Sequence, residues 1–356
     1  MKTLTIDLQP TYSIYFRDDL LQEKTFADFL HARAEQLVII TDSHLKDTWA
    51  KKVQSYVQQH QLNAELLYFP AGEASKTRET KQALEDQLLA KYYGRDTCLI
   101  AVGGGVVTDM TGFIAATYCR GISAVYLPTS LLAMVDASIG GKTGVNTPFA
   151  KNRIGCFYQP KAVFIDENFL TSLPQAEFTN GFAEVMKHAL ILDEALFQTL
   201  GDTRHIIYRS CQIKKNIVEQ DEHEQNLRQI LNFGHTIGHA IEQCEHYRIR
   251  HGEAVAMGMW VESYLSMKMG FLKEAAFHKI IAAFKQYHLM FKTSAFQDLK
   301  QFQQALLLDK KAQAKNPKFV LLEKIGKVHT AQGQYSHAVP DNILQDALQW
   351  AKQNLT

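Results

Sequence analysis

Residues 98–118 read CLIAVGGGVVTDMTGFIAATY, an apolar run followed by three glycines and then by apolar residues at helical spacing. This pattern predicts a strand over 98–104, a tight turn and a helix over 106–118. Glycines in this setting let the backbone approach a phosphate, whose charge the helix N-terminus stabilises. The segment matches neither GxGxxG nor a P-loop, so a strand-to-helix turn without a ligand is the alternative.

The alternation of strands and helices continues on both sides of this stretch. Further strands are predicted at 36–42, 64–70, 123–130 and 161–166, and helices at 44–60 and 77–93. Strands separated by helices predict a parallel sheet covered on both faces, in a Rossmann-like α/β domain. Ligands of such sheets bind beyond the carboxyl ends of the strands. Asp42 ends one strand and could accept from a ribose hydroxyl, although a turn or helix cap is its commoner role.

The second half of the chain has a different pattern. Helices are predicted at 181–200, 204–219, 227–245, 252–268 and 275–287, and a β-rich run occurs only at 318–328. We place the boundary after Ser172, because Pro174 disfavours a helix or central strand running through that point. The sequence therefore predicts two domains, an α/β domain over 1–172 and a mainly α-helical domain over 173–356.

Composition excludes several classes of protein. With 46% hydrophobic and 21% charged residues, the 356-residue chain is neither disordered nor collagen-like. Its formal net charge of +1 creates no global field for nucleic acid or an anionic membrane, so neither is expected as a partner. Its five cysteines include no CxxC pair, and neither a signal peptide nor an apolar run of 18 residues is found. We therefore expect a cytoplasmic protein.

Residues 136–152, DASIGGKTGVNTPFAKN, combine glycines with polar donors. Two glycines precede Lys142 and leave room for a ligand beside its ammonium group, while Asn146, Lys151 and Asn152 add further donors. Loops seldom concentrate glycine, lysine and amide donors without a ligand, which favours a binding segment. A solvated loop is the alternative.

Three further segments of the second half suggest a metal. Glu184 and Lys187, three residues apart, form by themselves the kind of pair that is usually an exposed ion pair of little energetic value. His235 and His239 lie four apart on one predicted helical face, and His251 follows in HGEAVAMGM. Two histidines and a distant Glu would form a catalytic metal site with an open position. Spacing leaves open which two histidines ligate, and a purely structural histidine pair is the alternative.

Together these segments resemble a known family. GGGVVTD (103–109), PTSLLAMVDASIGGKTGVN (128–146), KN (151–152), GFAEVMKHALI (181–191), LNFGHTIGHAIE (231–242), HGEAVAMGM (251–259) and DKK (309–311) occur in the order found in 3-dehydroquinate synthases, members of the sugar phosphate cyclase superfamily. The resemblance implies NAD in the first domain, a divalent metal in the second, usually zinc, and a homodimer. A ligand set of one Glu and two His also accepts cobalt. The resemblance further implies conversion of 3-deoxy-D-arabino-heptulosonate 7-phosphate to 3-dehydroquinate and phosphate by oxidation, β-elimination, reduction and aldol closure.

The resemblance also assigns roles to individual residues. It makes Glu184, His235 and His251 the metal ligands. On the substrate phosphate it places Arg120, near a neighbouring subunit, with Asn152, Lys187, His239 and either Lys310 or Lys311. On the substrate carboxylate or hydroxyls it places Lys142, Lys214, Arg228 and Asn232, and near the reacting alcohol Asp136. The NAD contacts it implies are Asp42, Gly72, Glu73, Ala74, Ser75, Lys76, Gly104, Gly105, Val106, Val107, Thr108, Asp109, Thr129, Ser130, Lys142, Lys151, Phe169, Leu170, Thr171 and Ser172.

Three other functions compete with this interpretation. Another sugar phosphate cyclase would keep the NAD and metal motifs, but Lys214, Arg228, Asn232 and the DKK segment favour a substrate with a carboxylate. A metal-dependent polyol dehydrogenase of related fold would accumulate NADH, whereas the cyclase reaction recycles it. A non-catalytic nucleotide-binding module would carry degenerate ligand positions, and the motifs here are intact.

Overall fold

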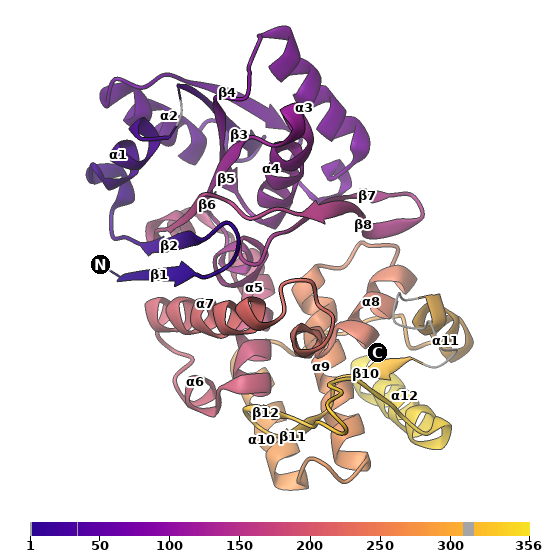
Figure 1. Cartoon of the computed structure of the whole chain (residues 1–356). Helices are drawn as coiled ribbons and strands as arrows, with labels where there is room; N and C mark the ends of the chain where they lie inside the picture. Colours follow the sequence, from indigo (N-terminus) through magenta and orange to yellow (C-terminus); the bar gives the residue numbers. More distant parts are fainter. Residues whose placement is uncertain (1, 34, 309–316) are drawn as a thin grey trace. The chain divides into compact units, whose positions relative to one another are not determined.

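The computed structural model describes residues 2–33, 35–308 and 317–356 of the chain. It divides into two compact units, Met1–Phe178 and Thr179–Thr356. The first is an α/β unit and the second is mainly helical, which confirms the predicted fold class (Figure 1). The boundary expected after Ser172 falls shortly before this division, and Pro174 directly precedes helix α5, Gln175–Leu192. In the described part of the chain, no helix has the length and apolar character needed to cross a bilayer.

The first unit is built around one sheet. Its seven strands in the described residues are β1 (Lys2–Ile6), β2 (Tyr12–Phe16), β3 (Gln36–Asp42), β4 (Ala64–Phe69), β5 (Thr97–Gly103), β6 (Ser123–Pro128) and β9 (Ala162–Ile165), in the order β1-β2-β9-β6-β5-β3-β4. All neighbours are parallel except the β1–β2 pair. Every residue of the interior strand β5, which lies between β6 and β3, is buried, as its unbroken apolar run predicts. The β1–β2 hairpin is the part of the sheet that the sequence pattern does not predict.

Helices connect these strands. They are α1 (Thr25–His31), α2 (Trp49–Gln59), α3 (Arg78–Ala90) and α4 (Gly105–Thr117), with short helices η1 (Leu20–Gln22), η2 (Glu73–Ser75), η3 (Tyr118–Arg120), η4 (Ala133–Ala137) and η5 (Glu167–Ser172). The predicted helix over 44–60 begins only at Trp49, after a series of turns. Helix α3 begins where Thr77 accepts a hydrogen bond from the backbone N–H of Thr80, at 3.2 Å.

The polar segment 136–152 is ordered by a second, separate pair of strands. Strands β7 (Lys142–Thr147) and β8 (Ala150–Phe157) form an antiparallel hairpin, so most of this segment from residue 142 onward is strand rather than loop. Gly144 pairs with Gly155, and a Cβ on Gly144 would lie only 2.6 Å from the carbonyl oxygen of Ile154. The two strands therefore approach more closely than side chains would allow. Asn146 of β7 also forms a parallel bridge with Thr77.

The second unit consists mostly of helices. After α5 come α6 (Glu194–Gln198), α7 (Thr203–Gln220), η6 (Leu227–Asn232), α8 (His235–Cys244), α9 (His251–Lys268), α10 (Glu274–Gln286), α11 (Leu299–Leu308) and α12 (Asp341–Leu355), with short strands β10 (Lys318–Phe319), β11 (Leu322–Lys324), β12 (Lys327–Val328) and β13 (His337–Ala338).

Two predicted helices of this unit are interrupted. The helix expected over 181–200 divides at Asp193, whose carboxylate accepts from the N–H of Leu196 at 3.0 Å and starts α6. The helix expected over 227–245 divides at Gly234, which has a left-handed φ of 79°. Helix α8 therefore starts at His235, a boundary that the apolar spacing alone conceals.

Glycines bring α8 and α9 into close contact. A Cβ on Gly234 would lie 2.7 Å from the carbonyl oxygen of Val255, and one on Gly258 would overlap the carbonyl group of Gly234. The buried carboxylate of Glu262 on α9 accepts from the N–H of Gly234 at 2.8 Å. These contacts hold the first turn of α8 directly against α9.

Replacing Gly258 by Ala should therefore lower the free energy of unfolding by about 1–3 kcal/mol, the usual cost of overpacking a well-packed core. Urea denaturation measures this change. Gly201→Ala is the matched control, because a Cβ there would meet no atom within 4 Å. Equal stability of the two variants would show that the α8–α9 contact tolerates a methyl group.

Candidate functional sites

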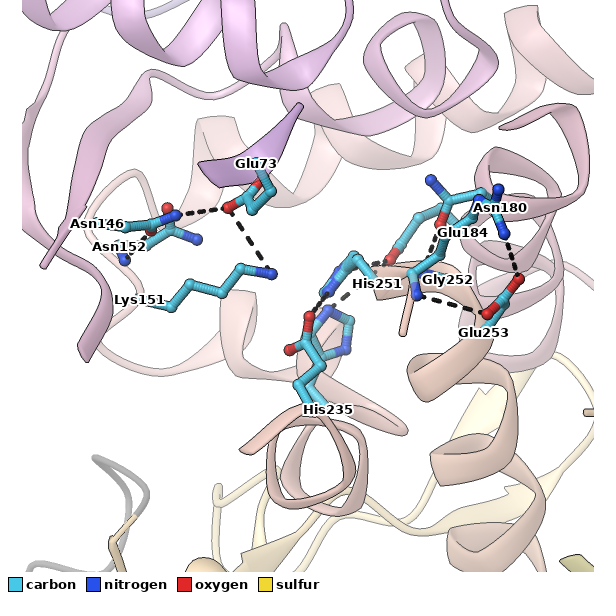
Figure 2. Close-up of polar contacts among 12 residues, drawn as sticks. Glu73, Asn146, Lys151, Asn152, Asn180, Glu184, His235, His251, Gly252 and Glu253 are labelled. Atoms are coloured by element: carbon cyan, nitrogen blue, oxygen red, sulfur yellow. Dashed lines mark hydrogen bonds and ion pairs between the residues drawn. The ribbon is translucent and has the colours of Figure 1, made fainter. Parts of the chain in front are cut away.

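The second unit brings a carboxylate and two imidazoles together (Figure 2). Glu184 comes from α5, while His235 and His251 are the first residues of α8 and α9. One ligand atom from each lies within 4.8 Å of the other two. Glu184 Oε1 is 3.4 Å from His251 Nε2 and 3.8 Å from His235 Nε2. Three residues far apart in the sequence thus present a donor set that could hold a divalent cation.

Lys187 forms an ion pair with Glu184, one helical turn away on α5. The side chains of Lys187 and Glu184 are 2% and 0% exposed, so this pair is not the surface ion pair that such spacing usually gives. Removing two charges from water is costly unless they are paired. A buried pair of this kind is a candidate for function rather than a surface feature.

The two imidazoles differ in their electrostatic surroundings. Burial, with the nearby Lys187 ammonium, holds the pKa of His235 well below its ordinary value of 6.5. Burial also opposes protonation of His251, but hydrogen bonds to the carboxylates of Glu184 and Glu242 outweigh it and raise the pKa to about 9. One ring is therefore neutral at pH 7, while the other carries a proton that a metal would displace.

Glu242 is a residue of this site that the sequence analysis missed. It lies on α8, is 1% exposed, and its Oε1 is 3.4 Å from His251 Nδ1. A carboxylate beside Nδ1 fixes the orientation of the ring, with Nε2 turned toward Glu184. The available signal was its position three residues after His239, on the same face of a helix.

His239 lies beside this group. Its ring centroid is 5.5 Å from that of His235 and 6.4 Å from that of His251. Sequence spacing left open which two of the three histidines would share a cation with Glu184. The structure gathers all three, with His235 and His251 as the two whose nitrogens approach the carboxylate.

The remaining candidates of the second unit lie on α7 and η6. Lys214 and Arg228 are buried, at 6% and 1% exposure. The guanidinium of Arg228 donates to the carbonyl oxygen of Glu222, and the side-chain amide of Asn232 donates to Glu224. Residues of loop 221–226 therefore accept hydrogen bonds from the side chains of Arg228 and Asn232. Lys310 and Lys311 lie outside the described residues.

In the first unit, the glycine turn lies at the carboxyl end of β5. Gly104 precedes the first residue of α4, and a Cβ on it would lie 3.2 Å from the hydroxyl of Ser130. The N–H of Thr129 donates to the carbonyl oxygen of Gly103 at 3.0 Å, so 129–130 and the turn are adjacent. The arrangement offers a helix N-terminus beyond two strand ends, where α/β sheets bind anions and nucleotides.

Asp42 also lies at a strand end, but its carboxylate has a local partner. Its Oδ1 accepts from the N–H groups of His44 at 2.9 Å and Leu45 at 3.3 Å. Burial raises the pKa of this carboxyl, against those two hydrogen bonds. The turn-capping role that the sequence allowed is therefore present.

Several other candidates of this unit form one connected group. The Lys76 ammonium donates to Asp109 Oδ2 at 2.5 Å and to Asn152 Oδ1 at 2.6 Å. Glu73 Oε1 accepts from Asn146 at 2.8 Å and lies 3.7 Å from the Lys151 ammonium. Residues assigned separately to the nucleotide and to the phosphate thus share contacts.

The other candidates are placed individually. Arg120 and Lys142 are exposed and Asp136 is half-buried in η4. At the end of η5, Ser172 accepts from the indole N–H of Trp49 at 2.7 Å, and Phe169 packs edge-on against the same ring. The segment 169–172 is thereby tied to the start of α2.

Comparison with known proteins identifies relatives over nearly the whole chain. A family model described as 3-dehydroquinate synthase N-terminal matches residues 66–180, and its C-terminal counterpart matches 181–312. A 3-dehydroquinate synthase of Thermoanaerobacter pseudethanolicus is 41% identical over 345 residues, covering 92% of this chain and 96% of the relative.

Two solved structures are also similar. A 2-epi-5-epi-valiolone synthase from Streptomyces hygroscopicus subsp. jinggangensis, with NAD+ and Zn2+ bound, has a TM-score of 0.85 at 27% identity, covering 96% of this chain and 97% of that one. A 2-deoxy-scyllo-inosose synthase complexed with carbaglucose-6-phosphate, NAD+ and Co2+ has a TM-score of 0.86 at 24% identity, covering 98% and 99%, and supports the fold alone.

The contrast between the histidines can be tested in metal-free protein. His251 should titrate at about pH 9 and His235 well below 6.5. Because the folded-state pKa of His251 is raised, its protonation stabilises the fold fully below pH 6.5, and this contribution is lost as the pH rises through about 9. Proton–nitrogen NMR, assigned with His251→Gln, measures both values. Titration of both rings near 6.5 would contradict the described environment.

Proposed function

The chain belongs to the 3-dehydroquinate synthase family, and we propose that it converts 3-deoxy-D-arabino-heptulosonate 7-phosphate to 3-dehydroquinate and phosphate. The observation that carries the proposal is the grouping of Glu184, His235 and His251 in a chain 41% identical to a 3-dehydroquinate synthase. The reaction is a phosphate-releasing lyase step in the shikimate pathway of aromatic biosynthesis.

We propose that Glu184, His235 and His251 hold the divalent metal. One carboxylate and two imidazoles suit zinc and also accept cobalt. Glu242 would keep the His251 ring turned toward the ion, and the 27% identical relative was crystallised with Zn2+. When bound, the metal supplies Lewis-acid polarisation of a substrate hydroxyl.

We propose that the first unit binds NAD at the glycine turn. The start of α4 would face the nucleotide's phosphates, and Lys76 and Asp109 would form part of the same surface. The relative crystallised with Zn2+ also contained NAD+. When bound, NAD supplies the acceptor for a hydride that is returned later in the cycle.

The proposed substrate has two anionic ends, to which the family resemblance assigns cationic and other polar residues. Arg120, Asn152, Lys187 and His239 are proposed for the phosphate. Lys142, Lys214, Arg228 and Asn232 are proposed for the carboxylate and hydroxyls, and Asp136 for the reacting alcohol. Guanidinium groups bind such anions as planar forks, and ammonium groups bind them as point charges.

These residues bind and orient the substrate rather than abstract its protons. In the elimination, the departing phosphate would itself accept the proton of the adjacent carbon, because that carbon is acidified by the new ketone. The C–H electron pair then forms the double bond as the C–O bond to phosphate breaks. The protein's contribution to the later ring opening and aldol closure would be correct positioning.

We further propose a cytoplasmic homodimer. All five cysteines are free thiols, which suits a reducing compartment. The dimer follows from the family resemblance, with Arg120 placed near the neighbouring subunit.

The competing activities share the fold but predict different products. The valiolone and inosose synthases are 27% and 24% identical to this chain, against 41% for the dehydroquinate synthase. A polyol dehydrogenase would form NADH in proportion to substrate consumed. The proposed reaction returns the hydride and needs only catalytic amounts of NAD.

The activity is tested by phosphate release from the heptulosonate phosphate, with NAD well below the substrate concentration. We expect many turnovers per NAD, no net NADH, and loss of activity with a chelator that zinc or cobalt restores. Stoichiometric NADH, or no phosphate release from metal-loaded protein, would contradict the proposal.

Glu184→Gln and His235→Ala should each lose bound metal and slow phosphate release by more than about 100-fold, since even outer-shell partners of a metal cost 10–100-fold. Metal content by mass spectrometry and steady-state assays measure both effects. Glu274→Gln and His278→Ala are matched controls, because these side chains are 79% and 68% exposed. Normal metal content in either site variant would remove that residue from the ligand set.

A further inference from the structure

Five polar side chains of the first unit form a continuous series from Glu73 to Asp109. Glu73 contacts Asn146, Asn146 contacts the backbone of Asn152, and the side chain of Asn152 contacts Lys76, which pairs with Asp109. Figure 2 shows Asn146 between Glu73 and Asn152. The series therefore joins the segment proposed for NAD to the asparagine proposed for the phosphate.

The partners define which way both amides face. Glu73, as a carboxylate, only accepts, so Asn146 must turn its Nδ2 toward Glu73, at 2.8 Å. Its Oδ1 then accepts from the N–H of Asn152 at 2.9 Å. An ammonium only donates, so Asn152 must turn its Oδ1 toward Lys76, at 2.6 Å. The oxygen of Asn152 is thereby committed to a cation, and its NH2 group is the end available to an anion.

The contact with Asn146 supports a left-handed backbone conformation at Asn152. Its φ of 53° lies in a region that asparagine adopts less readily than glycine but more readily than most other residues. Asn146 can supply this support because its own position is determined by main-chain contacts. Its N–H donates to the carbonyl oxygen of Lys76 at 2.7 Å, and it bridges to Thr77.

We propose that Asn146 is a positioning residue that couples the nucleotide-side segment 73–76 to Asn152, so that Asn152 presents amide donors to the substrate phosphate. The inference rests on the proposed function, because it assumes NAD on one side and a phosphate on the other. Asn146 touches neither ligand in this account. It acts through Glu73 and through the peptide N–H of Asn152.

Two variants separate the two contacts of Asn146. Asn146→Leu removes both, and should raise KM for the heptulosonate phosphate by about tenfold, with a smaller change in kcat, and weaken NAD binding. Asn146→Asp keeps an acceptor for Asn152 but sets a second carboxylate beside Glu73. It should weaken NAD binding while KM for the sugar phosphate stays within about threefold of wild type.

Asn216→Leu, an exposed asparagine on α7, is the matched control and should change neither constant. Unchanged KM and NAD affinity in Asn146→Leu would overturn the inference. If Asn146→Leu does not fold, Asn146→Asp decides the question, since NAD binding equal to wild type would then refute the coupling through Glu73.

A readout without turnover separates this inference from the proposed function. Hydrogen exchange at the Asn152 N–H should accelerate about tenfold or more in Asn146→Leu and stay unchanged in Asn216→Leu. Wild-type protein that releases no phosphate would refute the function, while faster exchange would still support the positioning role. Equal exchange rates would refute that role whatever the activity.

Discussion

Close contact between the backbones of α8 and α9 is the constraint on which the second unit's site depends. Gly234 and Gly258 remove the side chains that would separate the two helices, and Glu262 accepts from the N–H that precedes His235. On α9, the N–H of Gly252 donates to the side chain of Asn180 at 2.6 Å. His235, the first residue of α8, follows Gly234, and His251, the first residue of α9, precedes Gly252. In both cases the N–H of the glycine donates a hydrogen bond to a side chain.

Each unit holds a buried ion pair among its candidate binding residues. Glu184 is fully buried and pairs with Lys187, and Lys76, at 3% exposure, pairs with Asp109. Such pairs contribute little net stability, because desolvation offsets most of their attraction. A better explanation is that the lysines can bind anionic ligands and the carboxylates can bind cations. The two units therefore follow the same principle, with each pair tied to candidate binding residues.

Much of the fold was predictable because it rests on local patterns. Five of the sheet's six described strands that pair in parallel follow from apolar runs, and most helices follow from apolar spacing. The β1–β2 and β7–β8 hairpins were not predicted, since their residues are mixed in polarity and their pairing is set by distant partners. The break at Gly234 was missed because one left-handed residue does not disturb the periodicity around it.

The candidate site shows the same division. The sequence by itself determined the candidate residues, including Glu184, the three histidines and the donors of 136–152. It could do so because a residue's identity fixes which donor, acceptor or ligand atoms it carries. Only the tertiary structure decided that Lys187 is buried, that Glu242 faces His251 and that Asn146 joins Glu73 to Asn152. Burial and side-chain partners depend on segments far apart in the chain, so no local pattern contains them.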